Sequence, residues 1–324
     1  MSHRRRVVLA GLAALPFAGP ATAQTWPQKP IRLLVPLGAG GTADIVARVI
    51  AEEAAKALGQ NIVIDNKPGA GGTIASAEAA RAAADGYTML LVSQGTMVFN
   101  MGLYKSPGYD SQKDLAPVAL TGGVSNVLIV PPSSPFKSVA DVIAAARAKP
   151  GEITYSSGGA GTSHHMSSVL FELRAGIKLQ HVPYRTAPAG ILAVMNSEVQ
   201  MAFYNTPTVL QQIRGDKLRA LAVTSEGRNE LLPSVPTMGE AGVRDYLVNT
   251  WVGFAVPRGT PQPVIQRLNA EFNRAAQLPA VREKMLAQGI ELAPPQAPEA
   301  VDKLVRDDLA LWVPIIKAAG ASAD

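Results

Sequence analysis

Three glycine-rich turns, each standing just before a predicted helix, constrain the fold of this chain more than any other feature. The first, GAGG at 38–41, separates an apolar run at 31–37 from apolar side chains at helical spacing after Thr42. Similar turns occur at 69–72 and 158–161, before Thr73 and Thr162. Each predicts a strand, a tight turn and a helix.

A glycine-rich turn that opens a helix can also bind an anion. It exposes backbone N–H groups at the positive end of the helix dipole, so no cationic side chain is required. Glycine serves turn geometry alone in many α/β proteins, and one such turn therefore establishes no site. Because the turn recurs, we favour two helix N-termini that face each other across a cleft and clamp a carboxylate or phosphate.

Strands and helices alternate between residues 29 and 120. Predicted strands at 31–37, 62–64 and 87–93 alternate with helices after 42 and at 73–84. This alternation predicts a parallel sheet, which places ligand sites beyond the carboxyl ends of its strands. The first two glycine turns and the polar run from Ser93 to Thr96 would then share one cleft.

A second α/β block follows, and the chain then returns to the first. The pattern predicts strands at 126–130, 153–156, 181–184, 199–204 and 218–224 with helices between them, the first of these capped by Ser138. Helices predicted at 261–276, 279–288 and 298–319 would pack back on the first block. We therefore expect two α/β domains joined by a two-crossing hinge, domain 1 at 24–122 and 250–324 and domain 2 at 123–249.

The first 23 residues have the pattern of an export signal. Three arginines precede an apolar run from 7 to about 18, and Ala-Thr-Ala precedes Gln24, where we expect cleavage. Adjacent arginines leave the twin-arginine route open beside the general one. No later stretch approaches the roughly 20 apolar residues of a spanning helix. We expect an extracytoplasmic, periplasmic protein.

Charge and cysteine content exclude several kinds of function. The leader holds three arginines and no acidic residue, so the formal charge falls from +5 to +2 in the mature chain. A mildly basic chain without basic runs and interleaved aromatics gives no support for nucleic-acid binding. The chain has no cysteine, which excludes disulfides, thiolate metal sites and cysteine nucleophiles.

Seven stretches of the chain together resemble the receptors of tripartite tricarboxylate transporters, the Bug family of periplasmic solute-binding proteins. They are IRLLVPLGAGGTADIVAR, LGQNIVIDNKPGAGG, ADGYTML, ITYSSGGAGTSHHMSS, HVPYR, LPSVPTMGEAG and WVGFAVPRGTP. The resemblance runs from about Trp26 to the C-terminus. It implies a type II periplasmic binding fold that closes on a small organic carboxylate and delivers it to membrane components of the transporter, as a monomer with neither cofactor nor enzymatic activity.

The resemblance also indicates two ligand loops. Carried over by position, they comprise Leu37, Gly38, Gly40, Gly41 and Asp44 in the first loop, and Ser157, Gly158, Gly161, Thr162 and His165 in the facing loop. To these we add Ser93, Thr96, Tyr184, Arg185 and Asn205 as expected ligand contacts. Asp44 also fits a capping or hinge role. Arg185 either pairs with a second carboxylate or is a solvated surface arginine.

Departures from the family pattern bear on the ligand. Leu37 and Ala39 stand where the family commonly has phenylalanine and proline, and Thr186 stands where glycine is usual. Ala193 and Gln200 replace acidic residues that an ammonium group would need. We therefore expect a plain organic acid, either a dicarboxylate or an aromatic carboxylate, rather than an amino acid.

Functions other than ligand binding have weaker support in the sequence. His164 and His165 are adjacent and would point to different sides of a helix without an acidic partner, so no metal site is expected. A secreted α/β hydrolase or isomerase acting on a small organic acid stays open, although the chain lacks a Gly-x-Ser-x-Gly elbow. The Gly-x-Gly-x-x-Gly motif of a dinucleotide-binding fold would require glycine at position 43, where this chain has alanine.

Overall fold

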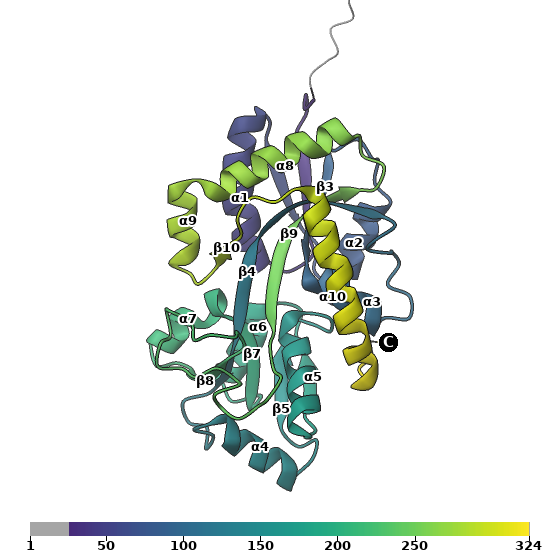
Figure 1. Ribbon diagram of the computed structural model, residues 1–324. Coiled ribbons are helices and arrows are strands. Elements are labelled where there is room, and N and C mark those ends of the chain that lie inside the picture. Colours follow the sequence, from purple (N-terminus) through teal and green to yellow (C-terminus); the bar gives the residue numbers. More distant parts are fainter. Residues whose placement is uncertain (1–25, 324) are drawn as a thin grey trace, which may run out of the picture.

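One sixteen-residue strand, β4 (Leu115–Val130), takes part in both halves of the molecule (Figure 1). The computed structural model describes residues 26–323, so the predicted leader at 1–23 and its cleavage site lie outside the described residues. Residues 115–125 of β4 pair with β9 (Asn249–Pro257), and residues 126–129 pair with β7 (Met201–Asn205). The sequence pattern predicted only the second part of this strand.

The sheet is mixed, whereas a parallel sheet was predicted. In the first half, β1 (Ile31–Val35) pairs in parallel with both β2 (Ile62–Asn66) and β3 (Thr88–Ser93). β9 then returns antiparallel to both β3 and β4, because it arrives from the second half of the chain. The prediction of parallel pairing was therefore right for β1–β3 and wrong for the centre of the sheet.

The second half continues the sheet from β4. β7 pairs antiparallel with β4 and in parallel with β5 (Thr154–Ser157), and β6 (Gln180–Pro183) follows at the edge. Two further strands, β8 (Arg219–Val223) and the short β10 (Glu291–Leu292), pair with β4 outside this order.

Helices cover both faces of the sheet, and the C-terminal helices return to the first half as predicted (Figure 1). α8 packs on α1 and β4, and α10 packs on β4 and α3. The helices are α1 (Thr42–Leu58), the 3-10 turn η1 (Ala70–Gly72), α2 (Thr73–Ala80), the π-helical turn η2 (Gly95–Phe99), α3 (Asn100–Leu103), α4 (Val139–Ala148), α5 (Ser163–Ala175), α6 (Ala187–Met195), α7 (Thr206–Arg214), α8 (Gln262–Gln277), α9 (Pro279–Leu286) and α10 (Pro298–Ala318). None of the helices in residues 26–323 is long and apolar enough to cross a membrane.

The apolar run that opens the chain forms β1 because both faces of the sheet are covered. Ile31, Leu33 and Val35 enter one core cluster with Phe254, and Leu34 enters the cluster on the other face. A strand buried on both faces reads as a continuous apolar run rather than as an alternation. The local signals for helices also hold: Ser138 caps α4 with a complete capping box.

The two passages of the chain between the halves lie side by side. Strand partners of β4 change between Ser125 and Asn126, and residue 249 at the start of β9 pairs with Ser125. Thr224 joins the passages: its Oγ1 accepts the Asn126 N–H at 2.8 Å and donates to the Val248 carbonyl at 2.6 Å. That the halves move as domains with the limits given above stays a prediction.

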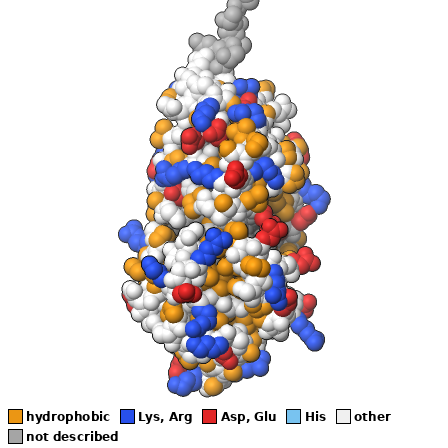
Figure 2. All heavy atoms as spheres, turned by 90° about the vertical axis from the view of Figure 1, so that its left-hand side faces the viewer, with side chains coloured by type: hydrophobic (Ala, Val, Ile, Leu, Met, Phe, Trp, Pro, Cys, Tyr) orange, Lys and Arg blue, Asp and Glu red, His pale blue; other side chains and the backbone are white. Residues whose placement is uncertain are grey.

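One face of the surface shows no large area of a single charge. In Figure 2, lysine and arginine side chains are interspersed with aspartate and glutamate over both halves of the molecule. This face has no basic stripe of the kind that tracks a nucleic-acid backbone.

Candidate anion-binding site

The first turns of two helices from different halves border one small cavity. Thr42 and Ala43 of α1 lie on one side, and Ser163 and His164 of α5 lie on the other. The N-cap of α1 is Gly41, which has no side chain to bond the N–H groups of that turn. Both positive helix ends are therefore brought to the same space.

Two adjoining cavities make up the cleft between the halves. The larger is about 40 Å³ and the smaller about 30 Å³, and they share Leu37, Thr42, Ala43, His164 and Asn205 in their walls. The larger is closed at its floor by Val124 of β4 and by Thr250 and Val252 of β9. These floor residues lie next to the passages of the chain between the halves.

Most of the residues predicted from the sequence line these cavities. The structure brings together Leu37, Gly38, Gly41, Ser93, Thr96, Gly158, Gly161, Thr162, Arg185 and Asn205. Gly40, Asp44, Ser157, His165 and Tyr184 line neither cavity and lie behind the walls or beside them. Ligand contact stays a prediction for both groups.

Asp44 supports the first glycine turn instead of facing the cavity. Its carboxylate accepts the Gly40 N–H at 3.1 Å, Arg48 Nε at 3.0 Å and Asn66 Nδ2 at 3.0 Å. Burial opposes ionisation of Asp44, but the bonds from Arg48 and the Gly40 N–H outweigh it and lower the pKa. Asn66 Nδ2 also donates to the Leu37 carbonyl, so the turn is fixed at both ends.

The facing glycine turn uses its own N–H groups internally. Gly158 N donates to His164 Nδ1 at 3.3 Å, Gly159 N to Ser157 Oγ at 3.0 Å, and Gly161 N to His165 Nδ1 at 3.3 Å. These N–H groups are occupied within the turn, and anion contact by them stays a prediction. Of the cavity hydroxyls, Thr96 and Thr162 donate to the Ser93 and Gly159 carbonyls, whereas Thr42 Oγ1 makes no hydrogen bond within the described residues.

His164 is held neutral at the cavity wall. Its Nδ1 accepts from Gly158, so its Nε2 carries the hydrogen and donates to Asn205 Oδ1 at 3.2 Å. Burial lowers its pKa to about 4. The sequence pointed to its neighbour His165, and only the rotation of α5 shows that His164 is the one facing the cleft.

The walls combine apolar side chains with uncharged polar groups. The larger cavity is lined by no lysine, arginine or carboxylate, and the smaller has one charged residue, the exposed Arg185. Thr42 Oγ1 is buried and has no hydrogen-bond partner among residues 26–323. In residues 26–323 no three His, Asp or Glu side chains gather as a metal site would require. The site thus offers hydroxyls and positive helix ends, which suit an anion.

The two halves touch tightly around the cavity. A Cβ atom on Gly71 would lie 2.0 Å from the Ala160 carbonyl oxygen, and one on Gly95 would lie 2.7 Å from the Gly161 carbonyl oxygen. Only glycine permits backbone to approach so closely. The second glycine turn therefore contributes to the contact between the halves.

Comparisons with known proteins agree on one family. A model described as tripartite tricarboxylate transporter family receptor matches residues 46–321. The protein BugT of Bordetella pertussis is 34% identical, with 99% of both chains covered. A solved structure of a Rhodopseudomonas palustris protein with adipate is 33% identical, covering 92% of this chain and 99% of that one, with a TM-score of 0.87. MatC from Rhodopseudomonas palustris, with bound malate, is 29% identical, covering 90% of this chain and 100% of that one, also at a TM-score of 0.87.

Proposed function

The chain belongs to the family of tripartite tricarboxylate transporter receptors, and we propose that it holds one carboxylate of its ligand between the first turns of α1 and α5. It is a periplasmic solute-binding receptor that captures a small organic carboxylate for such a transporter. We propose further that residues 1–23 direct its export, and that the halves at 24–122 with 250–324 and at 123–249 are its moving domains, with the ligand between them.

The observation that carries this proposal is the meeting of two helix N-termini at one cavity without an acidic side chain. Charge-assisted hydrogen bonds contribute about 1.5–3 kcal/mol each, and a closed site strengthens them by excluding water. Thr42 Oγ1, buried without a partner, supplies a further donor when an anion enters. An ammonium group would find no carboxylate in either cavity wall.

Cavity size and Arg185 favour a short dicarboxylate. A water molecule needs roughly 10–15 Å³ of such volume, so cavities of about 40 and 30 Å³ accommodate only a few non-hydrogen atoms in addition to one carboxylate. The smaller cavity leads to Arg185, which can pair with a second carboxylate. Two related proteins were solved with the dicarboxylates malate and adipate.

Thermal unfolding and titration calorimetry test the proposal on protein refolded to remove any ligand. The panel is malate, succinate, adipate, benzoate and glutamate, with succinamide as the uncharged match for succinate. Dicarboxylates should raise the unfolding midpoint and be recovered unchanged, and succinamide should not raise it. Conversion of any acid would instead support the alternative of a hydrolase or isomerase.

A pair of variants locates the site. Thr42→Val removes one hydroxyl at constant shape and should weaken dicarboxylate binding about tenfold, as expected for one hydrogen bond to a charged group. Arg185→Gln should weaken dicarboxylates more than it weakens benzoate, which has one carboxylate. Equal stabilisation by succinate and succinamide, or native affinity in Thr42→Val, would contradict the proposal.

A further inference from the structure

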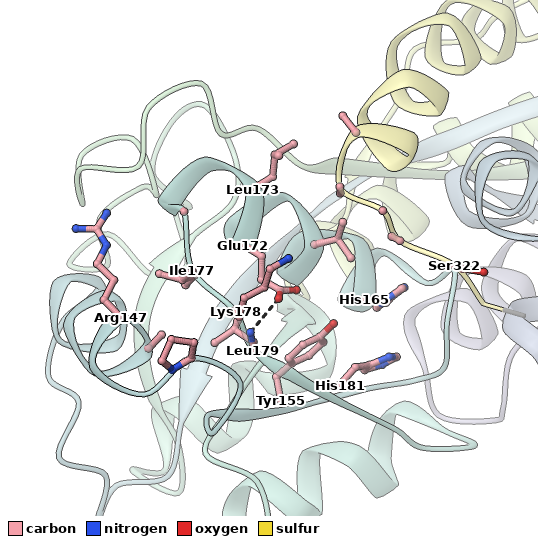
Figure 3. A pocket seen from close by; sticks show the side chains of 18 residues that line it. Arg147, Tyr155, His165, Glu172, Leu173, Ile177, Lys178, Leu179, His181 and Ser322 are labelled. Atoms are coloured by element: carbon pink, nitrogen blue, oxygen red, sulfur yellow. Dashed lines mark hydrogen bonds between the residues drawn. The ribbon is translucent and has the colours of Figure 1, made fainter.

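Three aromatic rings are stacked behind the facing glycine turn, outside the anion cavity. The rings of Tyr155 and His181 have centroids 4.9 Å apart, those of His181 and His165 are 4.3 Å apart, and both interplanar angles are 15°. The rings border a separate cavity of about 630 Å³ between α5 and residues 318–322 of the C-terminal segment (Figure 3). Neither this cavity nor the stack belongs to the anion site.

Two of these rings reach the turn through hydrogen bonds. Ser157 Oγ accepts the Gly159 N–H at 3.0 Å, so its own hydrogen is free to bond His181 Nε2 at 2.6 Å. His165 Nδ1 accepts the Gly161 N–H at 3.3 Å. His165 Nδ1 therefore acts as an acceptor, whereas the direction of the bond between Ser157 Oγ and His181 Nε2 depends on the tautomer of His181. Burial is the main cause that lowers their pKa, to about 4 for His181 and about 3 for His165.

The position of His181 is not explained by packing alone. It lies on the edge strand β6, is half-buried, and borders the large cavity. An apolar ring would stack there equally well, but it would leave the Ser157 hydroxyl without this hydrogen bond. The turn that this bond fixes carries Gly158 and Gly161, which line the anion cavities, and Ala160, which meets Gly71 of the other half.

We propose that His181 is a positioning residue for ligand binding, which fixes residues 157–161 through Ser157 Oγ and through its stack on His165 without touching the ligand. The proposal rests on the function proposed above. A turn that is ordered before the ligand arrives costs less conformational entropy at binding and at closure. Loss of the His181 bond should therefore weaken binding although every residue of the cavity wall stays in place.

Two substitutions separate the hydrogen bond from the ring. His181→Phe keeps the stack and removes the hydrogen-bonding atom, whereas His181→Gln loses the ring but can return a hydrogen-bonding group near the position of Nε2. Titration with malate and adipate should give about tenfold weaker binding for His181→Phe, and His181→Gln should recover most of it. Lys178→Gln, an exposed residue of the same large cavity, is the matched control and should bind as the wild type does.

A second measurement does not depend on ligand. Hydrogen exchange of the free protein should be faster for the amides of residues 157–161 in His181→Phe than in the wild type or in Lys178→Gln. If His181→Phe fails to fold, Ser157→Ala takes its place because it removes the same bridge, and His181→Gln stays the variant that should bind nearly as the wild type does.

The outcomes separate the two proposals. If the wild type binds no acid of the panel, the proposed function is wrong. The hydrogen-exchange measurement alone then tests whether His181 orders residues 157–161. Affinity of His181→Phe within twofold of the wild type, or unchanged exchange at residues 157–161, would overturn the positioning role. Additive losses in the double variant Ser157→Ala with His181→Phe would overturn it too, since one shared bridge predicts that the double variant binds no worse than the weaker single variant.

Discussion

Gly161 illustrates how one residue couples backbone conformation to closure. Its φ is +78°, and a Cβ there would lie 2.1 Å from Asn100 Oδ1 of the other half. Its N–H is already bonded to His165. Substitution should therefore act on ligand affinity through closure rather than through a lost contact between the N–H and the anion.

We expect Gly161→Ala to weaken binding at least tenfold and to lower stability by about 1 kcal/mol, since alanine resists positive φ. The double variant with Asn100→Ala should regain part of the affinity and none of the stability, because only the clash between the halves is relieved. Calorimetric titration and urea unfolding of both variants measure this. Native affinity in Gly161→Ala would show that the halves need not meet at this residue.

The three histidines of the described chain make a second prediction, on pH. Burial lowers the pKa values of His164, His165 and His181 to about 4, 3 and 4, below the ordinary value near 6.5. The unfolded chain therefore binds more protons than the folded chain between pH 6.5 and 4. Stability should be fully present above pH 6.5 and fall on acidification, by up to about 1.4 kcal/mol per pH unit for each histidine.

Urea unfolding between pH 7 and 5.5 checks this slope, since ordinary carboxyl groups titrate below that range. In His181→Gln, the change in unfolding free energy per pH unit should be smaller by about the contribution of one histidine. A stability that does not change across the range would mean that the rings are solvated in the folded protein.

Residue types and their order along the chain were enough to predict most of the residues that line the candidate site. They were not enough to predict which side chains face the cavity. Thr96 and Asn205 were predicted from their position at or after the end of a strand, and Leu37 was predicted from the family resemblance; all three line the cavities. His164 and His165 are neighbours, and only the phase of α5 decides which one faces the cavity. Thr250 and Val252 reach the floor because β9 arrives from the far half, which no local pattern records.

At the scale of elements, the N-caps of α4 and α5 are a matched pair. Ser138 accepts from Asp141 N and Thr162 accepts from His165 N, but only the α5 cap borders the anion cavity. Ser138→Ala and Thr162→Ala should each cost about 1 kcal/mol of stability. Dicarboxylate affinity should fall in Thr162→Ala alone, because loosening the first turn of α5 disturbs one side of the clamp.

Thermal unfolding and calorimetry on the two variants test this comparison. Equal affinities in both would mean that the N-terminus of α5 has no part in binding.

Helices and strands were predicted well from the sequence where a local signal marks their ends. They were predicted poorly where pairing with a distant strand sets their length. Ser138 marks the start of α4, and the prolines at 261, 279 and 298 mark the starts of the C-terminal helices. β4 was cut short in the prediction because Thr121, Gly122 and Gly123 interrupt its apolar pattern. In the structure these residues stay extended because β9 and β10 bond to both sides of the strand.

At the scale of the whole molecule, the contact between Gly38 and Thr186 offers a direct test of closure. A Cβ at Gly38 would lie 3.1 Å from Thr186 Cβ, a few tenths of an ångström short of the usual disulfide range. The chain has no other cysteine to compete. Oxidised Gly38→Cys with Thr186→Cys should stay closed, exchange malate very slowly, and show the same small-angle scattering with and without it.

The reduced double variant should open, bind and show a smaller radius of gyration with malate than without. Each single variant under the same oxidant is the control. Identical scattering from reduced protein in the presence and absence of saturating malate would indicate a rigid, preformed site.

The floor of the anion cavity has one more consequence. Val124, Thr250 and Val252 lie beside the passages between the halves, so a ligand bound as proposed would lie close to the axis about which the halves would turn. Points far from an axis travel further than points near it, in proportion to their radius. A displacement of under an ångström at the carboxylate would thus become a much larger one at the opposite ends of the molecule, near α4 and α8 (Figure 1). A membrane partner that contacts both ends of the receptor would then distinguish the loaded from the empty receptor by the distance between those ends, without contacting the ligand.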